Sequence, residues 1–409
     1  MTTREVLAIR DFRFLWGAQV VSFFGDALTT MGLLFLVQRA VGGTAAVAGV
    51  LIANALPFLL VGLVAGVWVD RLDRKAVMIW SDVIRAGLVL LIPVVGADRL
   101  WLLYVLVFIH ASVGTFFAPA RTALIPRIVP SAGLPAANGL AEATRPVALV
   151  LGTATAGLLV GVFDGFVAVF TLDALTFLVS AVFVGRVATS GRSATPTTAG
   201  IRAVAAELGA GFATVARNRI LLGVLVGGAV AMFGLGATNA LAVPFVIGEL
   251  GLAETWFGLI EGAQTVGLVV AGSSLGWLSR RLGLQRIVSL ALAAVGVLVA
   301  LLSQVTGLPG LVVLFLAIGL GVAPLTGSVS TLLQRETPPE LLGRVAASLN
   351  ATVTGASVGS MAVAATLAGL VGVRGVFVVS GLVALVASAA SALLFRGTAP
   401  AAAAEAATP

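Results

Sequence analysis

The sequence is short of the residues that soluble enzymes use for chemistry. Its 409 residues contain no cysteine, one histidine and one tyrosine, and only 10% are charged. The missing cysteines exclude disulfides and thiolate metal sites, and one histidine excludes a histidine-cluster metal site. Soluble domains carry about a quarter charged residues. With 59% hydrophobic residues and a mean hydropathy of +1.13, this chain cannot bury its apolar surface in a soluble fold.

Long apolar runs take the place of charge. A bilayer core of about 30 Å is crossed by roughly 20 apolar residues of helix. The first half has such runs at 14–38, 46–69, 76–96, 100–120, 138–162 and 166–186. The second half has runs at 219–247, 255–278, 287–306, 310–332, 344–371 and 375–395. The sequence therefore predicts an all-α membrane protein with about twelve transmembrane helices in two six-helix bundles.

A single long polar stretch separates the two sets of runs. It opens with Ser, Thr, Pro and Gly residues, and its later part, 201–216, has the pattern of an amphipathic helix. We predict an N-terminal bundle at 1–186, a cytoplasmic linker at 187–218, a C-terminal bundle at 219–396 and a disordered Ala/Pro-rich tail at 397–409.

Basic residues predict the orientation, because Lys and Arg are retained on the cytoplasmic side of short loops. They cluster at alternate loops, and only Arg39, Arg99 and Arg374 fall at the others. We therefore expect both termini in the cytoplasm of a multi-pass protein of the inner (cytoplasmic) cell membrane. The net charge of +7 is explained by this topology, and no nucleic-acid partner is expected.

The two halves share an internal repeat. Gly62-x-x-x-Gly66 has a counterpart in Gly272-x-x-x-Gly276, and each is followed by a basic loop. Gly residues four apart allow helix backbones to approach closely in lipid. Transporters often place their substrate site between two related halves, so the repeat favours transport.

The first of these loops resembles the signature loop of the major facilitator superfamily. The residues that carry the resemblance are Gly66, Asp70, Arg71, Arg74 and Lys75, and Asp73 stands where the family usually has glycine. A second stretch, from Phe116 to Pro130 with Pro119, Arg121 and Pro126, resembles the branch of macrolide efflux proteins and the enterobactin exporter, a transmembrane secretion effector type. The run from Leu172 to Phe177 resembles that branch too.

The resemblance implies twelve helices around a central cavity, alternating access, and a loop that holds the two halves together on the cytoplasmic side. It also implies export of a small organic molecule. Two departures argue against borrowing the family's antiport mechanism. Many proton-coupled exporters of the family carry an arginine inside the fourth helix, whereas the fourth predicted helix here has only His110 among its inner residues. The run from Gly152 to Gly157 lacks the usual proline.

Asp26 is the leading candidate for a transport residue. It lies about 18 Å along the first predicted helix, near the middle of the bilayer, with no charged residue at helical spacing on that helix. An ionisable group at this depth costs about 3 kcal/mol or more, so it usually faces a cavity, a partner or an ion path. Asp26 either exchanges a proton or contacts a cationic substrate. Alternatively, its carboxyl group receives hydrogen bonds from a residue of another helix.

Two further pairs have a spacing of three residues, which places oppositely charged side chains on one helical face. Glu142 and Arg145 either neutralise each other or gate the two halves. Asp82 and Arg85 are expected to form a structural pair. Asp173 and Glu261, each roughly 10 Å from the outer side, have no obvious local partner and are proton or substrate candidates. His110 either shuttles protons or is simply hydrogen-bonded.

These observations favour a secondary exporter that works as a monomer and moves an amphipathic drug, macrolide or siderophore by proton-coupled antiport. A flippase for lysophospholipid-like molecules is the alternative, favoured by the apolar composition. No nucleotide-binding loop or catalytic triad pattern is present in the sequence, so we expect neither an enzyme nor a cofactor or metal.

Overall fold

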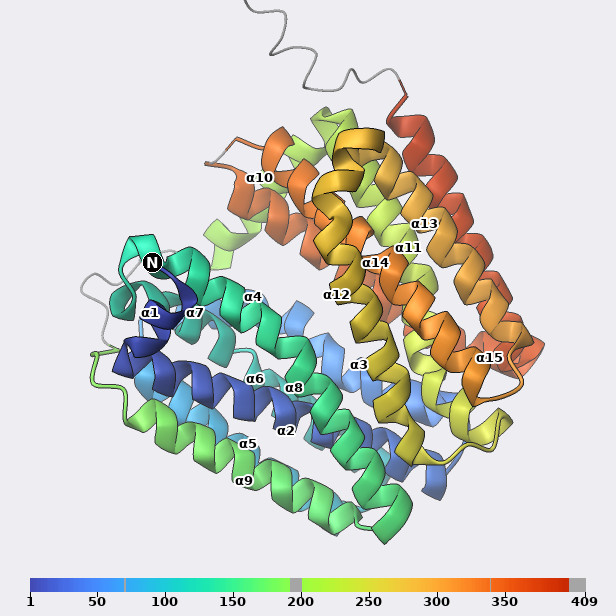
Figure 1. The fold of residues 1–409 in the computed structure, drawn as a ribbon. Helices are drawn as coiled ribbons and strands as arrows, with labels where there is room; N and C mark the ends of the chain where they lie inside the picture. Colours follow the sequence, from blue (N-terminus) through green and yellow to red (C-terminus); the bar gives the residue numbers. More distant parts are fainter. Residues whose placement is uncertain (70, 192–200, 339, 397–409) are drawn as a thin grey trace, which may run out of the picture. The chain divides into compact units, whose positions relative to one another are not determined.

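The computed structural model of the chain describes residues 1–69, 71–191, 201–338 and 340–396, and every regular element within them is a helix (Figure 1). Contacts divide the chain into two compact units. Unit 1 comprises Met1–Arg202 and Val243–Glu261, and unit 2 comprises Ala203–Ala242 and Gly262–Pro409. The predicted bundle boundaries stay a prediction, because these units are defined by contacts and unit 1 includes 243–261. The predicted tail, 397–409, and Asp70 lie outside the described residues.

Unit 1 consists of helices, most of which are long and apolar. They are α1 (Thr3–Ala8), α2 (Arg10–Ala40), α3 (Thr44–Leu60), α4 (Gly62–Val69), α5 (Arg74–Val95), α6 (Leu100–Gly114), α7 (Phe117–Ile128), α8 (Leu134–Phe163) and α9 (Phe166–Gly185), with short helical turns η1 (Ser131–Gly133), η2 (Pro244–Glu249) and η3 (Glu254–Trp256). The central helix α2 packs against α8 and α9, and α5 packs against α6 and α9. Residues on the inner faces of α2, α5 and α9 therefore meet.

Unit 2 has the same all-helical construction. All or most of each of the following elements belongs to it: α10 (Ile201–Arg217), α11 (Arg219–Val243), α12 (Phe257–Leu282), α13 (Leu284–Leu301), η4 (Leu302–Gln304), α14 (Leu308–Glu336) and α15 (Leu342–Leu394). The first residues of α10 and α12 and the last residue of α11 belong to unit 1. Helix α13 packs against α14 and α15. The 53 residues of α15 contain a break at Gly372, whose φ of 73° lies in the left-handed region that favours glycine. Two of the predicted crossings are therefore joined end to end in α15.

The helices match the predicted crossings closely. Within the described residues, nine helical stretches are long and apolar enough to span a membrane, and α15 accounts for two predicted crossings. The crossing predicted at 46–69 is divided into α3 and α4 at Val61, and the one predicted at 255–278 is α12. The crossing predicted at 100–120 extends to Ile128 as α6 and α7. Pro119 does not end it, because proline in the first turn of α7 lacks only an N–H that would be unpaired anyway.

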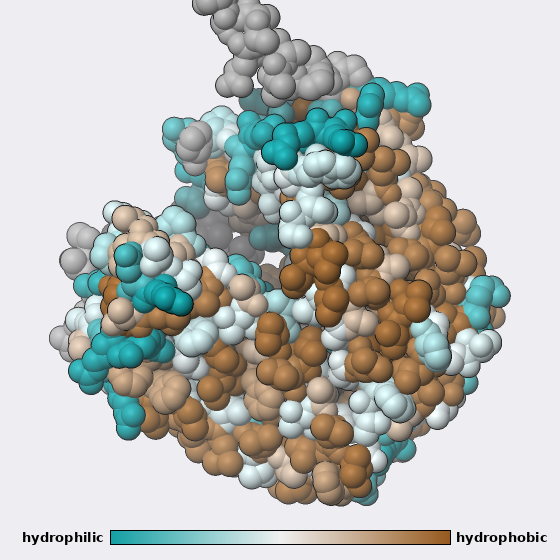
Figure 2. Space-filling view, viewed as in Figure 1, coloured by the Kyte–Doolittle hydropathy of each residue, from teal (hydrophilic) through white to brown (hydrophobic). Residues whose placement is uncertain are grey.

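The outer surface of each unit is suited to lipid. Apolar residues cover the sides of the helices (Figure 2), and large side chains such as Val94, Trp101 and Leu370 are 80%, 68% and 78% exposed. Hydrocarbon covers such surfaces without the cost that water would impose. The polar residues of unit 1 that this apolar shell encloses are the candidates for function.

Candidate functional site

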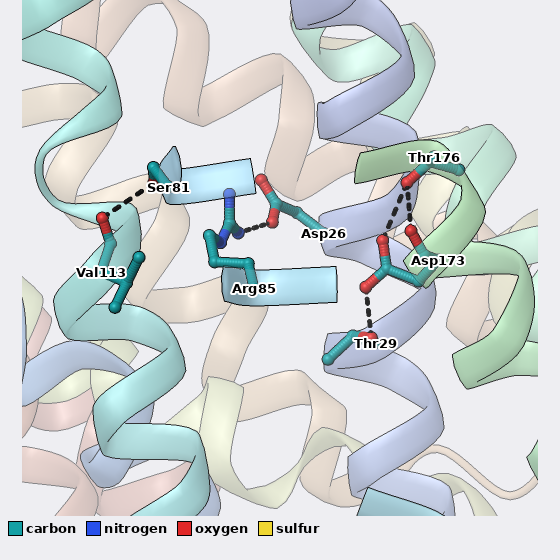
Figure 3. Close-up of polar contacts among 7 residues, drawn as sticks. All are labelled: Asp26, Thr29, Ser81, Arg85, Val113, Asp173 and Thr176. Carbon is teal, nitrogen blue, oxygen red and sulfur yellow. Dashed lines mark hydrogen bonds and ion pairs between the residues drawn. The ribbon is translucent and has the colours of Figure 1, made fainter. Parts of the chain in front are cut away.

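An ion pair joins the two central helices of unit 1. Arg85 of α5 donates from Nη2 to Oδ1 of Asp26 on α2 (Figure 3). The Arg85 side chain is 8% exposed and that of Asp26 is 34% exposed. The guanidinium also lies 4.1 Å from the ring centroid of Phe177 on α9, a favourable cation–π distance. Asp26 is therefore not a lone carboxylate, because a partner on another helix supplies its counter-charge.

The pair expected between Asp82 and Arg85 is not the one that forms. Both residues lie on one face of α5, but Arg85 turns to Asp26, a partner that helical spacing cannot reveal. Asp82 is completely buried, and its two carboxylate oxygens have no hydrogen bond of good geometry in the described chain. The Ser180 hydroxyl of α9 is its polar neighbour, and Arg85 is within electrostatic range. Asp82 is thus a second carboxyl that the same guanidinium can serve.

Asp173 of α9 is the third carboxyl of this region. It is completely buried and accepts hydrogen bonds from the hydroxyls of Thr29 on α2 and Thr176, the latter at 2.9 Å (Figure 3). Gly25 makes this contact possible, since a Cβ there would lie 2.0 Å from Asp173 Oδ1. Sequence spacing showed no partner for Asp173, because its main partner comes from a different helix.

Asp26, Asp82, Arg85 and Asp173 form what we call the carboxyl cluster. Electrostatic interactions couple Asp26 and Arg85 to both buried carboxyls. Full ionisation would place three negative charges against one guanidinium, and an unpaired buried charge costs several kcal/mol. Protonation of one carboxyl would relieve this cost. His110 of α6 lies beside it, with its ring 5.7 Å from that of Phe177.

A cavity of about 480 Å³ within unit 1 opens onto the cluster. Asp26, Arg85 and His110 line it, whereas Asp82 and Asp173 do not. Polar side chains of Gln19, Ser22 and Asn54 and the apolar side chains of Phe23, Phe58 and Leu149 complete much of its wall. The arrangement places one carboxyl of the cluster at the cavity and two behind it.

Arg145 also lines this cavity, but without the partner expected from spacing. Among the described residues no ion pair joins it to Glu142, although both lie on α8. Its guanidinium lies 5.5 Å from the ring centroid of Phe23. Arg121 of α7, another lining residue, is in electrostatic range of both Glu142 and Arg145. Arg145 therefore belongs to the wall of the cavity. No contact in the structure supports the hypothesis that Arg145 pairs with Glu142.

The structure does not place Glu261 with the cluster. It lies on α12, is half-buried and does not line the unit 1 cavity. Phe257, one helical turn earlier, packs edge-on against Phe35 of α2 with ring centroids 5.1 Å apart. The proposal that Glu261 carries a proton or substrate thus rests on its position in the sequence alone.

The signature loop is tied to the segment that follows α9. Asp73 caps α5 by accepting from the Ala76 N–H at 3.0 Å, which explains how aspartate replaces the usual glycine. Lys75 Nζ donates to the Val187 carbonyl at 2.6 Å, and the Arg74 N–H donates to the Gly191 carbonyl at 3.2 Å. Gly66 lies within α4, and Arg71 is exposed. Residues 187–191 thus cover this basic loop.

A second ion-pair group in unit 1 was missed by sequence reasoning. Arg39, at the end of α2, donates to Glu254 and Asp164, each at 2.6 Å. Burial, the largest single effect, raises the pKa of Glu254, but the hydrogen bond and the charge of Arg39 together with a backbone hydrogen bond outweigh it, so that pKa lies below its usual range. Gly157 allows the contact, since a Cβ there would lie 2.4 Å from the Glu254 carbonyl oxygen. No sequence signal connects residues so far apart.

Comparisons with known proteins agree with this architecture. The profile of the Major Facilitator Superfamily matches residues 15–353 and 224–409. Macrolide efflux protein A of Streptococcus pyogenes is 28% identical over 346 residues, covering 82% of this chain and 83% of that protein. The putative bacilysin exporter BacE of Bacillus subtilis is 31% identical over 178 residues, covering 43% of this chain and 44% of that protein.

Solved structures show the same fold. A bacterial homologue of the iron transporter ferroportin superposes with a TM-score of 0.73 at 18% identity, over 95% of this chain and 99% of that one. The predicted fold class, an all-α membrane protein with twelve transmembrane helices in two bundles, is confirmed, and so is the resemblance to the macrolide efflux branch.

Proposed function

The chain belongs to the major facilitator superfamily, and on that premise we propose that it is a proton-coupled secondary exporter of a small amphipathic organic compound. The observation that carries the proposal is the carboxyl cluster of unit 1, with Asp26 at a cavity and Asp82 and Asp173 buried behind it. Neighbouring carboxylates disfavour one another's ionisation, so a cluster with more carboxyls than cations takes up a proton more readily than an isolated carboxyl does.

Arg85 is the part of the cluster that connects proton binding to a structural change. Its guanidinium keeps its charge at every relevant pH, so it always requires a counter-charge. A proton that reaches Asp26 from the cavity neutralises that carboxylate and weakens its bond to Arg85. The guanidinium then pairs with a deprotonated Asp82 or Asp173. Because Asp26 belongs to α2 and the others to α5 and α9, the exchange changes which helices are held together.

Membrane energetics favour this coupling. Moving one elementary charge through 100 mV is worth about 2.3 kcal/mol, and a pH gradient adds to it. A proton that enters the cell through the cluster therefore supplies enough free energy to concentrate a neutral substrate outside by well over tenfold. Alternating access requires that the protonated and deprotonated clusters favour different conformations.

The cavity favours an organic substrate. Cavities of about 300–1,000 Å³ with apolar walls and a few polar groups are typical of small-molecule sites, and the unit 1 cavity, about 480 Å³, is of this kind. Two of the relatives are named for macrolide efflux and bacilysin export. We therefore take drugs, macrolides, bacilysin and siderophores as the compounds to test. The proposal places both termini of a monomer in the cytoplasm.

The test compares two aspartate variants in proteoliposomes loaded with erythromycin, ethidium, bacilysin or enterobactin. Asp26→Asn removes the cavity carboxyl, whereas Asp98→Asn alters an exposed aspartate in the loop before α6. For at least one compound we expect Asp26→Asn to lower pH-gradient-driven transport at least tenfold while exchange at equal pH continues. Asp98→Asn is expected to behave as wild type in both assays.

Three outcomes would contradict the proposal. The compounds do not move at all, they move without regard to the proton gradient, or Asp26→Asn keeps the full response to the gradient. A parallel assay with headgroup-labelled lysophospholipid separates export of soluble compounds from lipid flipping. Movement of that lipid alone would favour the flippase.

A further inference from the structure

A strongly basic pocket lies in unit 2, apart from the carboxyl cluster. Its volume is about 970 Å³, and it lies at the helix ends where α12 passes into α13 and where α14 and α15 end. Five arginines line it, namely Arg280, Arg281, Arg286, Arg335 and Arg396. All five are exposed. Figure 2 shows hydrophilic residues gathered over the turn between α12 and α13.

The protein supplies little counter-charge to these arginines. Glu336 is the one acidic residue in the lining, and it accepts a hydrogen bond from Asn218 at 3.2 Å. None of the five arginines forms an ion pair in the part of the chain that the structure describes. Arg281 lies 4.4 Å from the ring centroid of Trp277 instead. Positive charges around one pocket repel one another, so an anion in the pocket would relieve the repulsion.

The repeat provides an internal comparison. The loop after Gly276 in unit 2 corresponds to the signature loop after Gly66 in unit 1. In unit 1 the protein covers its own loop, since the carbonyls of Val187 and Gly191 accept from Lys75 Nζ and the Arg74 N–H. In unit 2 the equivalent place is an open pocket with guanidinium groups around it. A ligand of the unit 2 pocket would take the place of those carbonyl acceptors.

The pocket has an apolar side that limits the choice of ligand. Leu282 and Leu290 line it and are 37% and 57% exposed, and Trp277, one turn before Arg281, is 52% exposed. Tryptophan and arginine together are typical of the level at which lipid headgroups meet acyl chains. A ligand that satisfies both sides has an anionic head and a hydrocarbon tail.

We propose that this pocket binds the phosphate headgroup of an anionic phospholipid, with an acyl chain along Leu290 and Trp277. Arg281, Arg286 and Arg335 come from three successive helices, so one phosphate bound between them ties the ends of α12, α13 and α14 together. Guanidinium groups suit this ligand because they bind phosphate oxygens in a bidentate manner. The site does not depend on the proposed export activity.

The experiment uses the full chain in nanodiscs of phosphatidylcholine with and without phosphatidylglycerol. Native mass spectrometry measures how much phosphatidylglycerol stays bound, and thermal unfolding measures its effect on stability. The wild type is expected to retain phosphatidylglycerol in preference to phosphatidylcholine and to unfold at a higher temperature when it is present. The double variant Arg286→Gln/Arg335→Gln is expected to bind phosphatidylglycerol roughly tenfold more weakly or worse, because each basic residue near an anionic surface contributes about 1 kcal/mol.

The matched control is Arg4→Gln/Arg186→Gln, which removes the same charge from exposed positions of unit 1. It is expected to retain phosphatidylglycerol as the wild type does. Equal retention of both lipids by the wild type, or an equal loss in the control variant, would overturn the proposal. Displacement of the lipid by millimolar inorganic phosphate would overturn it as well, since the pocket would then be a site for free anions. If the glutamine variant fails to fold in phosphatidylcholine, the wild-type lipid titration decides alone.

Discussion

Unit 1 buries charged side chains, whereas the described part of unit 2 buries only hydroxyls among its polar groups. The buried ionisable residues Asp82, Arg85, His110, Asp173 and Glu254 all belong to unit 1. In unit 2 the buried polar residues are Ser303, Ser328, Thr337, Ser348, Ser360, Ser380 and Ser391. Several of these serines donate to backbone carbonyls, as Ser391 does to Gly223 at 3.2 Å.

The difference shows how a repeated architecture divides its tasks. A serine that donates to a carbonyl joins helices without any group that titrates near neutral pH. The strength with which a buried carboxyl holds two helices together depends on whether it is protonated and on the nearby positive charge. Proton sensitivity is therefore expected in unit 1, and unit 2 should respond to pH mainly through unit 1.

The largest effect is expected from removing the one cation of the carboxyl cluster. Arg85→Gln leaves Asp26 unpaired and Asp82 and Asp173 without their nearest positive charge, at a cost of about 3 kcal/mol. This is the lower end of the range for buried pairs, because Asp26 is partly exposed. Thermal unfolding in detergent measures it. In unit 2, Arg335→Gln should change stability by less than about 0.5 kcal/mol in the same detergent.

A double variant gives the control for that result. Asp26→Asn/Arg85→Gln removes the pair together, so it should recover much of the stability that Arg85→Gln alone loses. If the stability lost by the double variant equals the sum of the losses of the two single variants, Asp26 and Arg85 do not stabilise each other. The contrast between the units would then lose its basis.

A somewhat smaller effect is expected from filling the space at Gly25. A Cβ there meets Asp173 Oδ1 and Thr176 Oγ1, each at 2.0 Å, so Gly25→Ala should cost about 2 kcal/mol. In unit 2 a Cβ at Gly227 meets Ser391 Oγ at the same 2.0 Å, but a hydroxyl can rotate away. Gly227→Ala should therefore lower the stability less than Gly25→Ala does, as measured by thermal unfolding of the two variants.

Gly87→Ala serves as the neutral control, because nothing lies within 4 Å of the added Cβ. Equal losses at Gly25 and Gly227 would mean that the carboxyl of Asp173 matters no more than a serine hydroxyl.

The next effect comes from one hydroxyl in each unit. Thr29→Val removes a donor to the buried Asp173 and should cost about 1.5 kcal/mol, as expected for a hydrogen bond to an ionisable group. Ser388→Ala in unit 2 removes a donor to the Ser289 carbonyl at 2.7 Å and should cost about 0.6 kcal/mol, the average inside membranes. Thermal unfolding of both variants measures the difference, and a reversed order would contradict it.

The smallest effect concerns pH and the Arg39 and Glu254 pair. Because the folded-state pKa of Glu254 lies below its ordinary value of 4.5, the stability from this pair is complete above that value. It is lost as pH falls through the lowered pKa. Glu254→Gln should therefore lower stability by about 1 kcal/mol at neutral pH, because Arg39 is partly exposed, and the difference from wild type should vanish in strong acid. A difference that persists in acid would show that the ion pair is not its source.

Sequence reasoning worked best where the physics is local along the chain. Apolar runs predicted the crossings within a few residues in most cases, and the polar pattern at 201–216 predicted helix α10. It was less accurate for the crossing predicted at 100–120, because the helical stretch there continues to Ile128. The cap that Asp73 provides for α5 is also a local feature, but it was not predicted, because Asp73 was considered only as a departure from the glycine that is usual in the family.

The candidate site was predictable only in part. Asp26, Arg85, Asp173 and Arg145 stood out because ionisable residues are rare in apolar helices. The partners of these residues could not be predicted from the sequence. Arg85 has Asp82 on its own helix at a suitable spacing, yet it pairs with Asp26 on α2. Arg39 counted only toward orientation, although it holds Glu254, which lies 215 residues further along the chain.

The sequence by itself determined that this protein is a helical membrane protein, how many apolar segments cross the membrane and which few residues are costly to place in lipid. Hydrophobicity decides these matters, and it is a property of each segment. Tertiary structure alone decided which carboxyl receives Arg85, that two buried carboxyls lie behind the one at the cavity, and that the basic loop of unit 1 is covered whereas that of unit 2 is open. Such choices depend on how helices face one another, because a buried charge is stabilised by whichever counter-charge the packing brings within a few ångströms.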